Sequence, residues 1–97
     1  MNVKLKPSAE YSLNSITEYI TKTIKMPETA DKYIDKLLNF ANQLSHAPNA
    51  YSLCKYPDWK IKNLQCATFN KTWVIAYKIV SNHVVIYYMK NGKLLNY

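Results

Sequence analysis

Residues 72–90 constrain the fold of this chain more than any other stretch. The segments 72–79 and 84–90 are both rich in β-branched and aromatic residues, which favour pleated, half-buried strands. The polar link between them, around Ser81 and Asn82, is short enough to join antiparallel neighbours. Neither segment has a clearly polar face, so we expect two central strands that are covered on both sides.

Strict alternation along these two strands divides their side chains between the faces of the sheet. In the first strand it separates Trp73, Ile75, Tyr77 and Ile79 from Val74, Ala76 and Lys78. In the second strand it separates Val84, Ile86 and Tyr88 from Val85, Tyr87 and Met89. Because an isolated hairpin is marginal in water, other parts of the chain must cover it.

Two amphipathic helices precede the hairpin. The first is expected over residues 9–25, where apolar residues recur at helical spacing and Ser8 is the expected N-cap. Pro27 is tolerated in a first turn and begins the second helix, whose apolar stripe reaches about residue 45. The short link makes the helices antiparallel neighbours, and their apolar faces need the sheet as a partner.

Strands occupy most of the remaining chain. Residues 2–6 alternate as a short strand that stops at Pro7, and residues 60–68 resume an extended pattern after a loop over 45–59. The element order is therefore β-α-α-β-β-β, in one domain over residues 1–97. This order predicts an α+β fold with the helical hairpin on one face of a three-stranded antiparallel meander. The first strand is expected at an edge or beside the last strand.

The composition argues against several classes of protein. No run approaches the roughly 20 apolar residues that a membrane span needs, and the N-terminus lacks the apolar stretch of a signal peptide, so we expect a cytoplasmic protein. Cys54 and Cys66 form no Cys-x-x-Cys motif and indicate neither a metal site nor a redox site. One disulfide is compatible with the sequence, but we expect two buried free thiols. No motif indicates a cofactor.

The charge is distributed unevenly. The net charge is +7, all 13 basic residues are lysine, and no acidic residue follows Trp59. A basic half on a small domain indicates a polyanionic partner, either nucleic acid or an acidic protein segment, although lysines also serve solubility alone. The lysines of this half are Lys60, Lys62, Lys71, Lys78, Lys90 and Lys93.

Three stretches resemble the RelE/ParE superfamily, the toxins of bacterial type II toxin–antitoxin pairs. Residues 7–20 are similar to the ParE-type opening, Ala-x-x-x-Leu-x-x-Ile-x-x-Tyr-Ile. Residues 30–48 are similar to the second helix of that family with its Leu-x-x-x-Pro ending. Residues 73–93 are similar to its last two strands and its basic, Gly-containing tail.

The resemblance implies one of two activities. ParE-like members poison DNA gyrase, whereas RelE-like members enter the ribosomal A site and cut mRNA. In both groups an antitoxin wraps the toxin and covers its basic groove, which implies an acidic antitoxin as partner in a hetero-oligomer. The ParE-type opening favours gyrase as the target. A degenerate toxin that binds only its antitoxin is a third hypothesis.

A nuclease built on this sequence would have to use lysines. In-line attack by a 2′-OH needs a base, cations around the phosphorane and an acid for the leaving oxygen. Lys62 could be the base only if burial or neighbouring cations lowered its pKa, and it would share a strand face with Lys60 about 7 Å away. The catalytic set of this hypothesis is Lys60, Lys62, Lys71, Lys93 and Tyr97.

The absence of arginine weighs against the nuclease hypothesis. RelE-like toxins place an Arg at the start of the third strand and another in the C-terminal tail, where this chain has only Lys71, Lys90 and Lys93. An ammonium group cannot make the planar, two-pronged phosphate contact of a guanidinium group. For binding without cleavage, the expected set is Lys60, Lys62, Lys71, Lys90 and Lys93.

Overall fold

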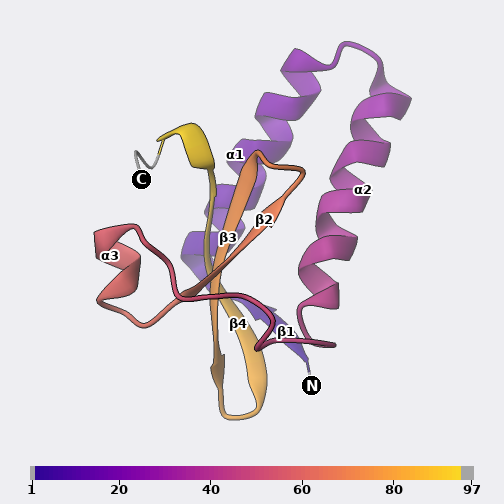
Figure 1. Cartoon of the computed structure of the whole chain (residues 1–97). Coiled ribbons are helices and arrows are strands. Elements are labelled where there is room, and N and C mark those ends of the chain that lie inside the picture. Colours follow the sequence, from indigo (N-terminus) through magenta and orange to yellow (C-terminus); the bar gives the residue numbers. More distant parts are fainter. Residues whose placement is uncertain (1, 95–97) are drawn as a thin grey trace.

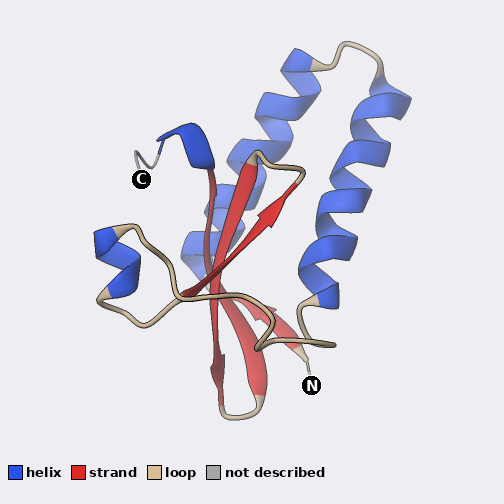
Figure 2. Ribbon diagram, viewed as in Figure 1, coloured by secondary structure: helices blue, strands red, loops and turns tan. Residues whose placement is uncertain are grey.

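In the computed structural model, which describes residues 2–94, a four-stranded sheet carries two long helices on one face (Figures 1 and 2). Its elements are β1 (Val3–Leu5), α1 (Pro7–Thr23), α2 (Pro27–Gln43), α3 (Pro57–Lys60), β2 (Gln65–Phe69), β3 (Trp73–Val80), β4 (His83–Asn91) and a 3-10 turn, Gly92–Leu94. The predicted α+β class is confirmed, with α3 as an addition to the predicted order. Within the described residues, no helix is long and apolar enough to cross a membrane.

The strands lie in the order β1-β4-β3-β2. The last three form an antiparallel meander, as predicted. β1 lies parallel to β4, with Val3 opposite Val84 and Leu5 opposite Ile86, so the first strand is beside the last one. A parallel pair needs a long crossover connection, and here the crossover contains the hairpin of α1 and α2.

The inner face of the sheet, which packs against α1 and α2, carries the main core. Ile75 and Tyr77 of β3 and Ile86 of β4 are completely buried in it, together with Leu37 of α2. α1 adds Ile16 and other buried residues of its apolar stripe. The helical spacing of apolar residues in the sequence therefore identified the correct faces of both helices.

The opposite, outer face carries a smaller core. Val74 and Ala76 of β3 pack there with Cys54, Trp59 and Leu64, which come from the segment between α2 and β2. β3 is thus covered on both sides, as its lack of a polar face predicted. α3 projects from this segment beside the sheet (Figure 2).

β4 contains a bulge that the sequence analysis did not predict. The register shifts between Ala76 and Tyr77 of β3, so Tyr87 of β4 has no partner of its own. The extra residue changes the faces that follow it: Met89 joins the inner core, and Tyr88 packs against the outer one. Strict alternation was therefore wrong from Tyr88 to the end of β4.

The strand predicted over residues 60–68 begins later than expected. Pro57 opens the short helix α3, and Asn63 has a left-handed backbone conformation (φ 60°) before β2 starts at Gln65. This compact turn buries the Trp59 ring, which is 3% exposed. Lys60 and Lys62 thus precede β2 and do not share a strand face, so that prediction was wrong.

Cys54 and Cys66 form a disulfide, so the expectation of two free thiols was wrong. Their Cα atoms are 4.9 Å apart. Two backbone hydrogen bonds place the two segments side by side: the Cys54 N–H donates to the Leu64 carbonyl, and the Cys66 N–H donates to the Ser52 carbonyl. Their spacing in the sequence does not reveal this pairing, because it depends on how the loop folds back on β2.

Helix α1 begins earlier than predicted, and Ser8 is not its N-cap. Pro7 lies in the first turn and Lys6 is the N-cap. The Ser8 hydroxyl donates instead to the Tyr87 carbonyl, at 2.6 Å. This bond ties the start of the helix to β4.

Candidate functional site

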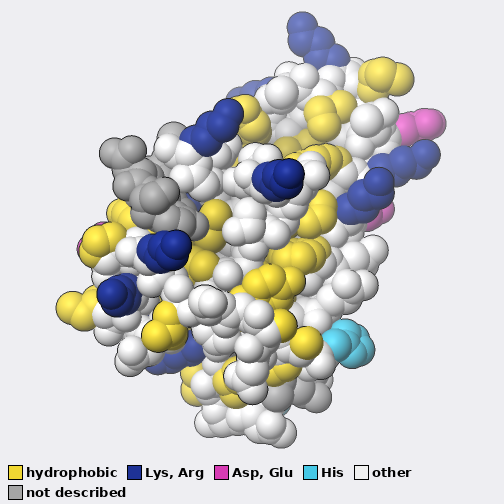
Figure 3. All heavy atoms as spheres, viewed as in Figure 1, with side chains coloured by type: hydrophobic (Ala, Val, Ile, Leu, Met, Phe, Trp, Pro, Cys, Tyr) yellow, Lys and Arg dark blue, Asp and Glu magenta, His cyan; other side chains and the backbone are white. Residues whose placement is uncertain are grey.

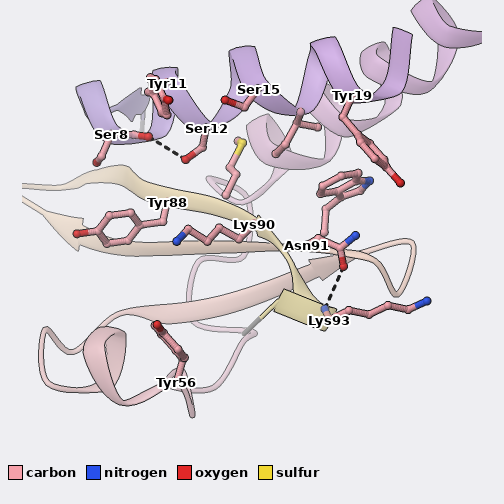
Figure 4. Close-up of a pocket in the computed structure, with 13 residues that line it drawn as sticks. Ser8, Tyr11, Ser12, Ser15, Tyr19, Tyr56, Tyr88, Lys90, Asn91 and Lys93 are labelled. Atoms are coloured by element: carbon pink, nitrogen blue, oxygen red, sulfur yellow. Dashed lines mark hydrogen bonds between the residues drawn. The ribbon is translucent and has the colours of Figure 1, made fainter. Parts of the chain in front are cut away.

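A groove of about 800 Å³ lies between α1 and the C-terminal half of β4 (Figure 4). We call it the α1–β4 groove. The side chains that α1 contributes are Ser8, Tyr11, Ser12, Ser15, Ile16 and Tyr19. The rest of the lining is Tyr56, Trp73, Tyr88, Met89, Lys90, Asn91 and Lys93.

The groove exists because β1 is much shorter than β4. β1 pairs with β4 only from Val84 to Ile86. The next bond on this edge comes from the Ser8 hydroxyl to the Tyr87 carbonyl, after which α1 leads the chain away. Within the part of the chain that the structure describes, no strand pairs with this edge over residues 88–91. An open strand edge offers backbone donors and acceptors to an added strand.

The groove is mainly aromatic on one side and basic at one end. Tyr11 is 76% exposed and Tyr19 is 55% exposed, although both are large aromatic residues. The Tyr19 ring meets the Trp73 ring edge-on, with 5.9 Å between centroids. Lys90 and Lys93 are exposed and contribute positive charge. Clustered exposed aromatic residues beside charged ones are typical of protein–protein interfaces.

A smaller hollow of about 390 Å³ lies on the outer face beside α3. It is lined by Tyr56, Asp58, Trp59, Ile61, Lys62, Tyr88 and Lys90. The rings of Trp59 and Tyr88 stack with an interplanar angle of 5° and 5.4 Å between centroids. Lys62 Nζ donates to the Tyr88 hydroxyl at 2.6 Å. This hydrogen bond raises the pKa of Lys62 above its ordinary value and outweighs the opposing effect of burial.

The structure brings some of the predicted site residues together and separates others. Lys62 and Lys90 line the outer hollow, and Lys90 also lines the α1–β4 groove with Lys93. Lys60 ends α3 and Lys71 lies in the turn between β2 and β3, and neither lines the two hollows. The predicted residue Tyr97 lies outside the described residues.

The sequence analysis missed the contribution of α1 to the groove. Ser8, Ser12, Ser15 and Tyr19 recur at intervals of four, three and four residues, which places them on one side of a helix. This second stripe was available as a signal, next to the apolar stripe that was recognised. A further signal was the contrast between the short first strand, stopped by Pro7, and the long last one.

The comparisons with known proteins agree with this architecture. The family model that matches residues 3–95 is described as "ParE toxin of type II toxin-antitoxin system, parDE". A solved structure entitled "Chromosomal ParDE TA system from P. aeruginosa" matches with a TM-score of 0.75 and 16% identity, over 94% of this chain and 95% of that chain. At this identity the likeness is one of fold. No curated protein matches the sequence. Because the family model covers nearly the whole chain, this protein belongs to the ParE toxin family of type II toxin–antitoxin systems.

Proposed function

We propose that this chain inhibits growth in the cytoplasm by binding DNA gyrase, and that a cognate antitoxin neutralises it. The family to which the chain belongs is that of toxins from type II toxin–antitoxin systems, which supports an antitoxin as partner. The ParE-type opening in residues 7–20 supports gyrase over the ribosome as the target.

The state of Lys62 is the observation that favours a binding toxin over an mRNA-cleaving one. A general base must be able to release its proton near neutral pH. The hydrogen bond to Tyr88 instead raises the pKa of Lys62, so this side chain stays an ammonium group. Lys60 lies on α3 rather than beside Lys62 on a strand. The nuclease alternative therefore lacks a general base at Lys62, and it lacks the expected pair of Lys60 and Lys62 on one strand face.

The α1–β4 groove is the surface that fits the antitoxin best. Its open edge over residues 88–91 can pair with an extended segment, and its aromatic side chains can bury apolar ones. Lys90 and Lys93 would attract acidic residues of the same segment. The groove therefore accounts for strand pairing, apolar burial and charge complementarity in a single partner.

The target is tested by inducing the chain in cells while DNA and RNA are examined together. We expect cleaved-DNA complexes of gyrase and altered plasmid supercoiling, with intact transcripts in primer extension. Cuts in translated mRNA that follow the codon phase, without any effect on supercoiling, would establish the nuclease instead. Cells that carry the empty vector provide the baseline for both measurements.

The antitoxin site is tested by filling the groove. Ser12→Arg with Ser15→Arg places two long side chains in its α1 wall, and we expect a toxin that its antitoxin no longer neutralises. Asn14→Arg with Thr21→Arg adds the same charge to exposed positions of α1 that do not line the groove. Antitoxin should still rescue cells from this control variant. Equal rescue from both variants would place the antitoxin elsewhere.

A further inference from the structure

The outer surface of β4 gathers four lysines from four separate parts of the chain. Lys6 lies between β1 and α1, Lys62 follows α3, Lys78 belongs to β3 and Lys90 to β4. Lys6 Nζ lies 4.4 Å from the centroid of the Tyr87 ring, and Lys78 Nζ lies 5.7 Å from the same centroid. We call these four residues the lysine row.

The other half of the row is built around the neighbouring tyrosine. Lys62 Nζ lies 2.6 Å from the Tyr88 hydroxyl, so this contact is a hydrogen bond at the edge of the ring. Lys90 lines the same outer hollow as Lys62 and Tyr88. Because the bulge at Tyr87 lets two successive tyrosines pack on the outer side, the Tyr87 ring lies near the ammonium groups of Lys6 and Lys78, and the Tyr88 ring lies near that of Lys62.

Few acidic side chains balance this charge. β1, β3 and β4 contain no Asp or Glu, and Asp58 is the one carboxylate that lines the outer hollow. In Figure 3 lysine side chains are spread over the visible face, while the acidic side chains in view lie mainly along α2. The ammonium groups of Lys6 and Lys78 bring two like charges close to one ring, so an anion near both would lower the electrostatic free energy.

We propose that the lysine row binds the phosphate backbone of double-stranded DNA without reading its sequence. From Val85, which pairs with Lys78, to Lys90 the strand extends over about 17 Å, the rise of about five base pairs. Lysines contact phosphates as point charges and carry no base specificity. The inference goes beyond gyrase binding, because the contact is with DNA itself.

The surroundings of the row favour a duplex over the other polyanions. A single strand would need free aromatic faces for its bases, but Trp59 is 3% exposed and stacks on Tyr88, while Lys6 and Lys78 occupy the Tyr87 ring. An acidic peptide would need a strand edge or an apolar groove, and both of these lie in the α1–β4 groove. Lys6, Lys62 and Lys78 do not line that groove and offer mainly charge, which suits a phosphate backbone.

The test measures binding of the purified full chain to a fluorescent 20-base-pair duplex by anisotropy, over a range of salt concentrations and without gyrase. Four phosphate contacts predict that the logarithm of the association constant falls with the logarithm of the salt concentration with a slope of about −3.6. Lys6→Gln with Lys78→Gln should weaken binding at least tenfold and reduce the slope by about 1.8. The matched control, Lys32→Gln with Lys36→Gln, removes the same charge from exposed positions of α2 and should leave the slope unchanged.

Several results would overturn the proposal. Equal losses in the two variants would mean that only net charge attracts DNA. Tighter binding of a single-stranded oligonucleotide than of the duplex would point to base contacts. A third such result is that the variant Lys6→Gln with Lys78→Gln binds the duplex as the natural sequence does and binds a glutamate-rich peptide more weakly. That result would mean that the partner of the lysine row is a protein. Because gyrase is absent from this assay, a failure to bind the duplex does not affect the gyrase proposal. In the same way, a failure to act on gyrase in cells would not affect the proposal of duplex binding.

Discussion

The inner face of the sheet packs against two helices of 17 residues each, whereas the outer face is covered in part by the segment that carries the four-residue α3. The inner core is mainly apolar, with Leu37, Ile75 and Ile86 completely buried. The outer core is smaller and contains a disulfide, a stacked Trp–Tyr pair and lysines that rest on tyrosine rings.

This contrast separates stabilisation by apolar burial from stabilisation by particular contacts. Burial of apolar area on the inner face is non-directional and tolerates many sequences, provided that the pattern is kept. The outer face depends on particular contacts, namely the Cys54–Cys66 bond and the Lys62–Tyr88 hydrogen bond. Changes to buried residues of the inner face should therefore lower the free energy of unfolding most, and changes to these contacts of the outer face should lower it less.

The largest effect is expected from Leu37→Ala on α2. This side chain is 0% exposed, and its truncation should lower the free energy of unfolding by about 2–5 kcal/mol, through lost burial and a cavity. Urea denaturation followed by circular dichroism measures the change. Leu53→Ala, at a position that is 55% exposed in the segment between α2 and α3, should stay within about 0.5 kcal/mol. A loss below about 1 kcal/mol for Leu37→Ala would contradict the dominance of the inner core.

An intermediate effect is expected from removing the disulfide. Cys54→Ser with Cys66→Ser opens a loop of 12-residue separation and should cost about 3 kcal/mol. The chain should keep its helical circular dichroism signal, because the inner core does not include this bond. A reducing agent should lower the urea midpoint of the natural sequence and leave that of the double variant unchanged. Loss of the helical signal would mean that the two faces are not separable.

The smallest effect is expected from Tyr77→Phe. The Tyr77 hydroxyl donates to the Pro48 carbonyl at 2.6 Å and so links the inner face to the loop after α2. Its loss should cost about 1 kcal/mol at pH 8, measured by urea denaturation. Tyr11→Phe, at a position 76% exposed, should be neutral.

The same substitution should also change the response to alkaline pH. Burial, with a smaller contribution from Tyr51, raises the pKa of Tyr77 to about 12. The unfolded tyrosine titrates near 10, so above that pH the unfolded state loses its proton first. The stabilisation from Tyr77 is therefore complete below pH 10 and is lost as the pH rises towards 12. The stability difference between the natural sequence and Tyr77→Phe should shrink over this interval. A constant difference would contradict the assignment.

The sequence was sufficient for the main layers of the fold because those layers depend on periodicity and on proline. The apolar stripes of α1 and α2, and the stop of β1 at Pro7, led directly to the helical hairpin and the four strands. The features that it did not reveal depend on contacts between distant segments. The disulfide requires residues 52–54 to lie beside residues 64–66, and no local pattern encodes this pairing.

The candidate sites were predictable to a similar, partial degree. Of the lysines after Trp59, Lys62, Lys90 and Lys93 line the two hollows, and their role in binding stays a prediction. Lys6 could not be associated with them, because it reaches Tyr87 only through the parallel pairing of β1 with β4. The burial of Trp59 in a helical turn competed with strand alternation, and the sequence alone does not decide between them.

The extra residue in β4 also affects how related sequences should be compared. If Tyr87 paired regularly instead of forming the bulge, the side chains of Tyr88 and Lys90 would point towards the helices, and an ammonium group would lose its water there at a large energetic cost. Deleting Tyr87 would therefore remove the bulge and leave Tyr88 and Lys90 on the outer face, because regular alternation from the inner residue Ile86 places the next residue there. A relative that lacks one residue at this place would thus keep its C-terminal lysines on the same surface, with a regular strand in place of the bulge.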